Sequence, residues 1–258
     1  MTKPVRRILV TNDDGINAPG LKAAIKIANE LSDDVWVVAP IEEKSGASHS
    51  LSLTQPLRLI KKGVQKYAVT GTPTDCVMFA TRHMLRDDPP ELVLSGVNFG
   101  QNIAEDVSYS GTVAAAKEGT VFGIPSVALS QAFSLDSRHK IRFEVGVRHG
   151  SSIIRKLLKL DWPQDTLMNI NFPDIDPDVR CKVRITKQGK RDARILCLEE
   201  RIDPRNNSYY WYDFKRESIN AGKGTDIEAI LEGDISITPL KMDHTDTRAK
   251  RRLSSLFG

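Results

Sequence analysis

Short apolar runs alternate with amphipathic stretches over the first two thirds of the chain. The runs Ile8–Thr11, Val35–Pro40 and Leu92–Ser95 have the length of single strands and contain no charged residue, which is typical of strands buried on both faces. Between the first two runs, apolar residues recur at helical spacing from Pro19 to about Leu31. Strands that alternate with helices predict an α/β fold with a mostly parallel sheet and right-handed crossovers.

The same patterns predict further elements downstream. These are a hairpin of Leu57–Ile60 and Tyr67–Thr70, helices at Thr72–Leu85, Gly111–Phe122 and Phe143–Leu160, and strands at Ser126–Leu129 and Met168–Phe172. Glycines and polar residues from Gly96 to Ser110 indicate a long loop. This loop would follow the third buried strand directly.

The regular alternation fades beyond about Asp174. Residues 1–178 are therefore expected to form the core, and residues 179–258 a β-rich extension that is not an independent domain. Strands are expected at Val183–Ile185 and Asp234–Pro239, separated by long polar segments. The stretch Asn206–Tyr212 is rich in aromatic residues, which are enriched at interfaces. We expect the extension to pack on the core or on a neighbouring subunit.

Composition excludes several classes of protein. The net charge of +4, from 37 basic and 33 acidic residues, is too small to indicate a nucleic-acid-binding protein. No segment approaches the roughly 20 apolar residues of a membrane span. The three cysteines have neither disulfide-framework nor zinc spacing, and the apolar run after the basic N-terminus is too short for a secretory signal. We expect a cytoplasmic protein with no membrane partner and no specific nucleic-acid partner.

Two adjacent carboxylates, Asp13 and Asp14, follow the first predicted strand directly. Ligands of open α/β sheets bind outside the carboxyl ends of the strands, and two crowded carboxylates repel each other unless a cation or a proton neutralises them. The pairs Asp33-Asp34 and Asp87-Asp88 instead precede strands, so we interpret them as solvated charges at the opposite edge. A turn with a helix-capping acid is the alternative interpretation of Asp13-Asp14.

Two other loops leave strand ends at the same predicted edge. One carries Ser45, and the other carries Asn98. Hydroxyl and amide oxygens are neutral ligands for Mg²⁺, Mn²⁺ or Ca²⁺, although each residue alone is more common as a turn residue. His49 lies in the Ser45 loop, and we interpret it as a solvated loop histidine.

A helix start forms the second candidate site. Ser110, Gly111 and Thr112 lead into an alanine-rich helix, and the free N–H groups and dipole of a helix N-terminus favour anions. Plain helix capping by the two hydroxyls is the alternative. Other phosphate motifs are incomplete: the spacing of Gly15 and Gly20 fits a P-loop, but the required Lys-Ser/Thr is missing.

Together these motifs resemble those of the survival protein SurE family of nucleotidases. The matching segments, in the family's order, are Thr11–Gly15 with Ala18–Gly20, Ser45–Ser48, Gly71–Val77, Ser95–Asn98, Tyr109–Ala116, Asp203–Arg205, Gly224–Asp226 and Ser236–Leu240. The resemblance implies a Rossmann-like three-layer core and a C-terminal region that exchanges elements between subunits of a homodimer or homotetramer. It also implies one divalent ion per subunit, with Mg or Mn favoured, and metal ligands at Asp13, Asp14, Ser45 and Asn98.

The activity implied by the resemblance is hydrolysis of nucleoside 5′- and 3′-monophosphates, and in some members of short polyphosphate. We expect Asp13 and Asp14 to be catalytic, and phosphate to be held by Asn12, Asn102, Ser110, Gly111 and Thr112. Asp13 is also a candidate to orient or deprotonate the attacking water. One departure concerns Glu42 and Glu43, which stand where the family commonly has cations. A nucleotide-binding or receiver-like regulatory module without turnover is the alternative function.

Overall fold

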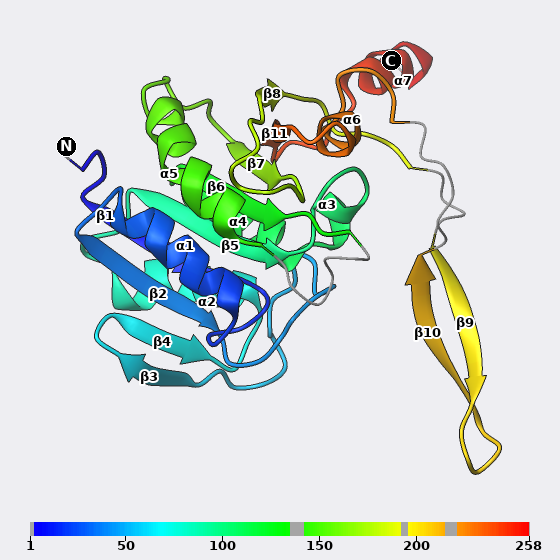
Figure 1. Cartoon of the computed structure of the whole chain (residues 1–258), viewed down its shortest axis with the longest axis horizontal. Coiled ribbons are helices and arrows are strands. Elements are labelled where there is room, and N and C mark those ends of the chain that lie inside the picture. Colours follow the sequence, from blue (N-terminus) through cyan, green and yellow to red (C-terminus); the bar gives the residue numbers. More distant parts are fainter. Residues whose placement is uncertain (1–2, 135–141, 192–195, 215–220, 258) are drawn as a thin grey trace.

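The computed structural model describes residues 3–134, 142–191, 196–214 and 221–257. Within them the main sheet consists of β1 (Arg7–Thr11), β2 (Asp34–Pro40), β3 (Leu59–Gly63), β4 (Lys66–Val69), β5 (Leu92–Phe99), β6 (Ser126–Gln131), β7 (Thr166–Phe172), β8 (Val183–Ile185) and β11 (Ile235–Lys241). The strand order is β3-β4-β2-β1-β5-β6-β7-β11-β8 (Figure 1). The strands from β4 to β7 run parallel, whereas β3 and β11 pair with their inner neighbours in the antiparallel direction. The predicted α/β fold is confirmed.

Helices cover both faces of this sheet and complete three layers. On one face α1 (Pro19–Asn29) and α5 (Glu144–Leu157) bury their apolar sides against β1, β5 and β7. On the other face α2 (Pro73–Phe79), which continues as a π-helical turn (Ala80–Met84), packs beside α4 (Gly111–Val121). The central strands are buried on both faces, which explains why their sequences read as continuous apolar runs.

Small residues let α4 lie close to the sheet. A Cβ added at Gly119 would lie 2.4 Å from the Ser126 hydroxyl and 2.8 Å from the Val93 side chain. Alanines 114–116 are buried, because this helix packs against both the sheet and the neighbouring α2. This close packing places the N-terminus of α4 next to the end of β1.

After β1 the chain adds strands on one side of β1, from β2 to β3, and then returns to add β5 and later strands on the other side. β1 pairs with β2 on one side and with β5 on the other, and Thr11 lies opposite Ser95 in the second pair. This is the topological switch point at which open α/β sheets bind ligands. The loops after β1 and β5 therefore open into one crevice.

One expectation about β5 is wrong. The loop predicted from Gly96 to Ser110 begins later, because β5 continues through Phe99, with a shift in its register against β6 between Ser95 and Asn98. The remaining connection also contains a short helix, α3 (Asp106–Tyr109). Asn98 consequently lies on a strand held between two neighbours rather than on a free loop.

Part of the C-terminal region completes the core. β11 pairs with β7, and β8 pairs with β11. α6 (Asp226–Leu231) packs close by, with Ile227 against Ile103 and Ala104. The buried Asp226 carboxylate accepts the Ala104 N–H at 3.0 Å and the Gly189 N–H at 2.8 Å. These contacts connect the C-terminal region to the segment that follows β5.

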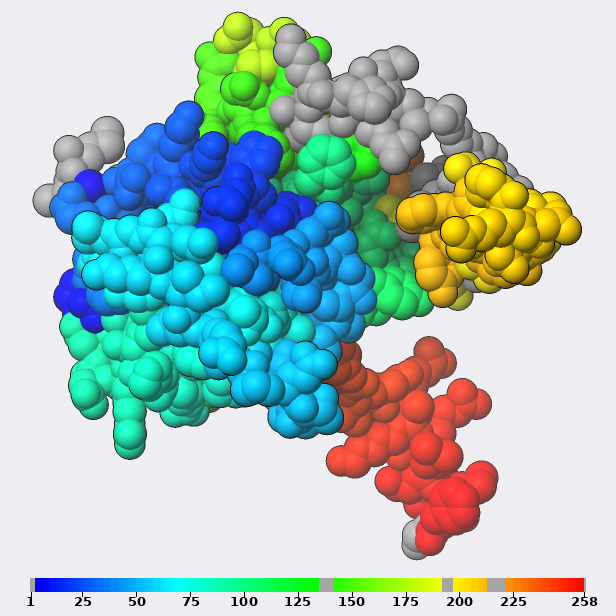
Figure 2. All heavy atoms as spheres, turned by 90° about the horizontal axis from the view of Figure 1, so that it is seen from below, coloured from blue at the N-terminus to red at the C-terminus, as the bar shows by residue number. Residues whose placement is uncertain are grey.

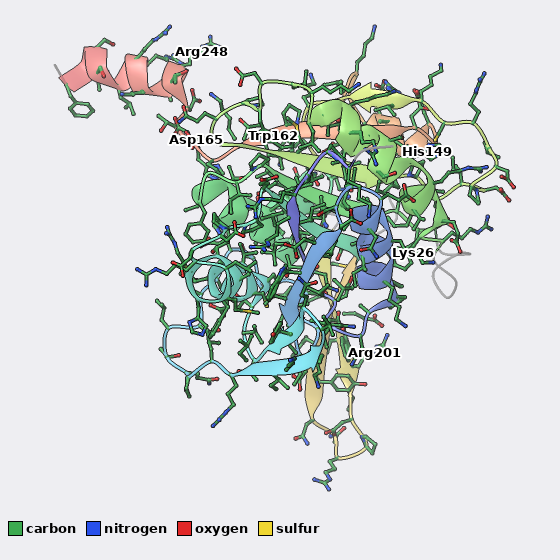
Figure 3. All side chains as sticks on the ribbon, turned by 90° about the vertical axis from the view of Figure 1, so that its left-hand side faces the viewer. Lys26, His149, Trp162, Asp165, Arg201 and Arg248 are labelled. Atoms are coloured by element: carbon green, nitrogen blue, oxygen red, sulfur yellow. The ribbon has the colours of Figure 1, made fainter. Side chains whose placement is uncertain are left out.

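Two other C-terminal elements stand away from the body of the protein. The hairpin of β9 (Leu196–Ile202) and β10 (Ser208–Phe214) extends outward in Figure 1 and lies apart in Figure 2. Helix α7 (Thr247–Phe257) has no buried residue and also projects, as Figure 3 shows with Arg248 in its first turn. Within the described ranges, none of the helices combines the length and apolarity needed to cross a membrane.

Candidate active site

Asp13 and Asp14 lie at the carboxyl end of β1, in the crevice at the switch point. Asp13 is 3% exposed, and the Thr112 hydroxyl at the start of α4 donates a hydrogen bond to its Oδ1. The half-buried Asp14 accepts the Phe99 N–H at 3.1 Å through Oδ2. Each carboxylate thus faces a different element of the site.

Two backbone contacts bring the other predicted metal ligands to this point. The Lys44 N–H donates to the Asp13 carbonyl at 2.8 Å, which places the next residue, Ser45, beside β1. The Phe99 contact with Asp14 places the preceding residue, Asn98, on the other side. All four predicted ligands therefore come from segments joined directly at Asp13 and Asp14.

The two neutral ligands are in different local states. Asn98 is buried and its amide nitrogen donates to the Gly100 carbonyl at 2.9 Å, so its carbonyl oxygen is the atom suited to a cation. The exposed Ser45 hydroxyl donates to Glu43 Oε1 at 2.9 Å. Because the hydroxyl acts as donor in this bond, the lone pairs of its oxygen remain available to a cation.

Burial sets the electrostatics of the aspartate pair. Burial raises the pKa of Asp13, partly opposed by hydrogen bonds from Thr112. Burial, and then the charge of Asp13, raises the pKa of Asp14 to about 7. Glu43 adds to the negative potential at both carboxyl groups. The site concentrates negative charge where water is largely excluded.

Other acidic pairs in the chain have cationic partners. Arg7 Nε lies 2.6 Å from Asp34 Oδ2, and Arg6 Nη2 lies 2.7 Å from Asp88 Oδ1. These pairs lie at the predicted opposite edge, and three of the four aspartates are exposed to solvent as expected; the ion pairs with arginines are an addition to that interpretation. Within the part of the chain that the structure describes, no lysine, arginine or histidine pairs with Asp13 or Asp14. Their charge is left for a bound cation or protons to neutralise.

The donor set fits a hard divalent cation. Across the described residues, no cluster of three or more His, Cys, Asp or Glu side chains has a metal-binding arrangement. A site at Asp13 and Asp14 must therefore draw on neutral oxygens such as those of Ser45 and Asn98. Two carboxylates with neutral oxygens suit Mg²⁺ or Mn²⁺ and leave coordination positions for water and substrate.

The start of α4 faces the same carboxylates. A Cβ added at Gly111 would lie 2.8 Å from the Asp13 Cβ, so only glycine fits there without a shift. The Ser110 hydroxyl accepts the Val113 N–H at 3.1 Å and caps the helix. Because Thr112 donates to Asp13, both hydroxyls have partners within the protein, and the helix terminus itself supplies the positive potential.

The two predicted asparagines differ in their availability. The Asn12 amide nitrogen donates to the Gly15 carbonyl at 3.0 Å, while its Oδ1 is buried and has no partner among the described residues. Asn102 is fixed more firmly, since its amide nitrogen donates to the Ser130 hydroxyl at 2.8 Å and its N–H donates to Asn171 at 2.7 Å. The bond to Ser130 uses one of the two N–H donors of the Asn102 amide, so the other donor can still contact phosphate.

A further pair of residues holds the Ser45 loop. His49 Nε2 lies 2.8 Å from Glu118 Oε2, on a side chain of α4 that is only 8% exposed. Ser48 adds two contacts, from its N–H to the Tyr109 carbonyl at 3.1 Å and from its hydroxyl to the Ser108 carbonyl at 2.8 Å. His49 is exposed in its loop, as expected, but its contact with Glu118 was not predicted, because no local pattern points to a partner 69 positions away.

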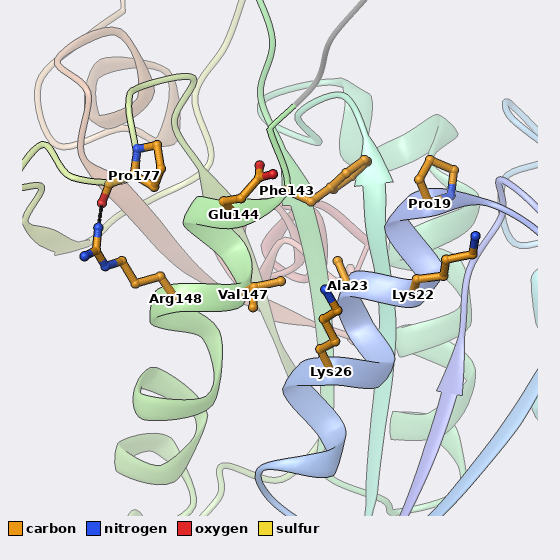
Figure 4. Close-up of a pocket in the computed structure, with 9 residues that line it drawn as sticks. All are labelled: Pro19, Lys22, Ala23, Lys26, Phe143, Glu144, Val147, Arg148 and Pro177. Atoms are coloured by element: carbon orange, nitrogen blue, oxygen red, sulfur yellow. Dashed lines mark hydrogen bonds between the residues drawn. The ribbon is translucent and has the colours of Figure 1, made fainter.

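A separate groove of about 450 Å³ lies between α1 and α5 (Figure 4). It is lined by Pro19, Lys22, Ala23, Lys26, Phe143, Glu144, Val147, Arg148 and Pro177. Arg148 is held by the Pro177 carbonyl and by Asp178 at 2.7 Å. None of the predicted metal or phosphate ligands lines this groove, so the chemistry is placed in the crevice at the end of β1.

Known proteins are similar to this chain in sequence and in architecture. Residues 8–195 match the family model described as survival protein SurE. The 5'-nucleotidase SurE of Parvibaculum lavamentivorans is 54% identical over 252 residues, which span 98% of this chain and 91% of the relative. That of Azorhizobium caulinodans is 55% identical over 251 residues, spanning 97% and 98%. The solved structure of the SurE protein from Aquifex aeolicus has a TM-score of 0.85 and 38% identity, and covers 98% of this chain and 100% of that chain.

Proposed function

The chain belongs to the survival protein SurE family, and from this premise we propose that it is a metal-dependent nucleotidase. It hydrolyses nucleoside monophosphates to the nucleoside and phosphate, as the name of its relatives indicates for their own activity. We propose that both 5′- and 3′-phosphates are accepted. The crevice at the end of β1 is the site of this reaction.

One observation carries the assignment of the site. The buried Asp13 and the half-buried Asp14 lack a cationic side-chain partner among the described residues, yet they lie beside Ser45, Asn98 and the start of α4. Burying uncompensated carboxylates is costly, and the chain pairs its other aspartate doublets with arginines. This arrangement supports a site that is completed by a divalent cation and a phosphate group.

We propose that Asp13, Asp14, Ser45 and Asn98 hold one divalent ion, Mg²⁺ or Mn²⁺, in each subunit. When bound, the ion supplies a Lewis acid that polarises the phosphoryl group and lowers the pKa of water. Asp13 is proposed to orient the attacking water or accept its proton, because its carboxylate is buried at the end of β1, beside the start of α4. Asp14 and Asn98 fix the ion relative to the end of β5.

The helix start of α4 is proposed to hold the phosphate. The N-terminal N–H groups and helix dipole stabilise negative charge as it develops on the phosphoryl oxygens. Asn12, Asn102, Ser110, Gly111 and Thr112 are the proposed contacts. The positive potential comes from the backbone, so the phosphate does not depend on a lysine or arginine near Asp13.

The loop before Ser45 favours monophosphates over long polyanions. Glu42 and Glu43 are exposed in this loop, and the charge of Glu43 reaches both aspartates. Two carboxylates at the mouth of the crevice repel the additional charges of a polyphosphate chain. We therefore propose that polyphosphate is a poor substrate.

The C-terminal extension is proposed to join subunits into a homodimer or homotetramer, while residues 1–178 carry the catalytic residues. Tyr210, Trp211 and Tyr212 on β10 are between 58% and 74% exposed, and Phe257 on α7 is 84% exposed. Apolar surfaces of this kind mark sites of association. Light scattering of the active protein should give a multiple of the 28.7 kDa chain mass, and a single-chain mass at micromolar concentration would contradict the proposal.

The nucleotidase proposal is tested by phosphate release from AMP. Release is expected with Mn²⁺, to stop with excess EDTA and to return when Mn²⁺ is restored. Binding of AMP without any release in Mn²⁺ would instead support a nucleotide-binding regulatory module. Release that continues unchanged in EDTA would contradict the metal dependence.

A further inference from the structure

An aromatic side chain stands at the rim of the crevice, next to the proposed metal ligands. Phe99 is the last residue of β5, follows Asn98 directly, and donates its N–H to Asp14 at 3.1 Å. The other residues of β5 are buried, whereas Phe99 is 45% exposed. A large apolar group is therefore partly in water within one residue of the reaction site.

A second aromatic ring holds Phe99 in place. The Phe99 and Phe133 rings have centroids 5.2 Å apart and planes inclined by 43°, an arrangement that stabilises aromatic pairs. Gly100 lies beneath Phe133, where an added Cβ would be 3.3 Å from the ring, and its N–H donates to the Gln131 carbonyl at 3.0 Å. Phe99 is the last residue of β5 and Phe133 lies two residues beyond the end of β6, so the two rings stand at the ends of adjacent strands.

We propose that Phe99, supported by Phe133, is the surface on which the nucleobase of the substrate stacks. The inference rests on the proposed nucleotidase function and names the part of the site that recognises the base. With the phosphate held at the start of α4, a nucleoside extends out of the crevice toward its rim. A base has a flat π face, and exposed aromatic side chains stack on such faces with little dependence on sequence.

The proposal predicts a preference among bases. Purines present a larger stacking surface than pyrimidines, so AMP and GMP should depend on Phe99 more than CMP and UMP do. The side chain contributes to binding, whereas its backbone N–H maintains the contact with Asp14. Side-chain substitutions therefore separate base recognition from the support of the metal site.

The test compares Phe99→Ala, Phe99→Leu and Phe99→Trp with wild type in Mn²⁺. Stacking of one base corresponds to about a 5- to 150-fold effect, so Phe99→Ala should lower kcat/KM for AMP in that range, mainly through KM. Phe99→Leu keeps the apolar bulk without the π face and should lose most of the same effect. Phe99→Trp should retain or improve the wild-type value.

Inorganic phosphate and adenosine separate the two halves of the substrate. The inhibition constant for phosphate should stay within about twofold in Phe99→Ala, because no base is involved. The dissociation constant for adenosine, measured by calorimetry, should rise in parallel with KM for AMP. As a matched control, Val121→Ala removes a 56% exposed apolar side chain at the far end of α4 and should change none of these values.

Each contrary outcome is distinct. Equal weakening of phosphate and adenosine in Phe99→Ala would show that the residue acts through Asp14, and unchanged values for both would show that it makes no contact. Either result overturns the stacking surface while leaving the nucleotidase intact. Absence of AMP hydrolysis by wild type would instead remove the proposed function, and the adenosine titration would still test the aromatic surface.

Discussion

Replacing Asp14 by Asn should stabilise the metal-free protein above neutral pH. In the folded chain the pKa of Asp14 is raised from its ordinary value of 3.8 to about 7, first by burial and then by the charge of Asp13. As pH rises, the unfolded chain loses this proton before the folded chain does. Ionisation of Asp14 therefore costs stability progressively from about pH 4 to pH 7 and fully above it.

The pKa values set the size of the effect. A difference of about 3 between folded and unfolded states corresponds to about 4 kcal/mol at 1.36 kcal/mol for each pKa unit, and partial hydration of the half-buried group reduces this to about 2–4 kcal/mol. Asp14→Asn keeps an oxygen that can accept the Phe99 N–H but removes the charge. The variant should lose less stability than wild type between pH 5 and pH 8.

Urea unfolding in EDTA at equal protein concentration measures this difference. Asp88→Asn is the matched control, since the hydrogen bond from Arg6 lowers the pKa of Asp88, and that substitution should not stabilise the protein at pH 8. Addition of Mn²⁺ should raise the stability of wild type far more than that of Asp14→Asn. If metal-free Asp14→Asn is no more stable than wild type at pH 8, the raised pKa of Asp14 in the folded protein is contradicted.

Further variants test the phosphate site, the Ser45 loop and the projecting helix α7. Ser110→Ala and Thr112→Val should each lower kcat/KM for AMP by about 10- to 150-fold if the two hydroxyls bind phosphate in the complex. Thr112→Val should also weaken Mn²⁺ binding, because the Thr112 hydroxyl contacts Asp13. Effects below twofold in both variants would show that the hydroxyls have a structural role only. His49→Ala should weaken Mn²⁺ binding by loosening the Ser45 loop, whereas His49→Gln, which retains a donor for Glu118, should bind Mn²⁺ as wild type does. Equal Mn²⁺ affinities of the two variants would count against a role of His49 in holding the loop. Deleting α7, residues 247–258, should leave the melting temperature of the core unchanged but reduce the mass seen by light scattering, and an unchanged mass would exclude α7 from the interface.

The sequence contains enough information to predict that the proposed metal ligands lie at one edge of the sheet. Buried strands without charges are recognisable from composition alone, and the aspartates after β1 stand out because they follow a strand whereas the other acidic pairs precede one. Parallel strands then bring Ser45 and Asn98 to the same edge. These positions depend on local patterns and on one general rule of sheet topology, so a single sequence suffices to predict them.

Contacts between distant segments could not be predicted in this way. Gly96–Phe99 resembles a loop because glycine and asparagine favour turns, yet pairing with β6 keeps it in the sheet. The Phe99–Phe133 contact depends on the register of β5 and β6, and the His49–Glu118 contact depends on where α4 lies. Tertiary packing decides each of these contacts, and no local periodicity encodes it.

Turnover of AMP by Asp13→Asn at saturating Mn²⁺ tests the central claim most directly. The substitution preserves volume but removes one of the two charges proposed to face the ion, and loss of this electrostatic stabilisation is expected to lower kcat at least about 100-fold. Circular dichroism and light scattering should show that the variant remains folded and assembled. Near-normal turnover by such a folded variant, with Mn²⁺ shown to be saturating, would contradict the assignment of Asp13 and with it the proposed metal site.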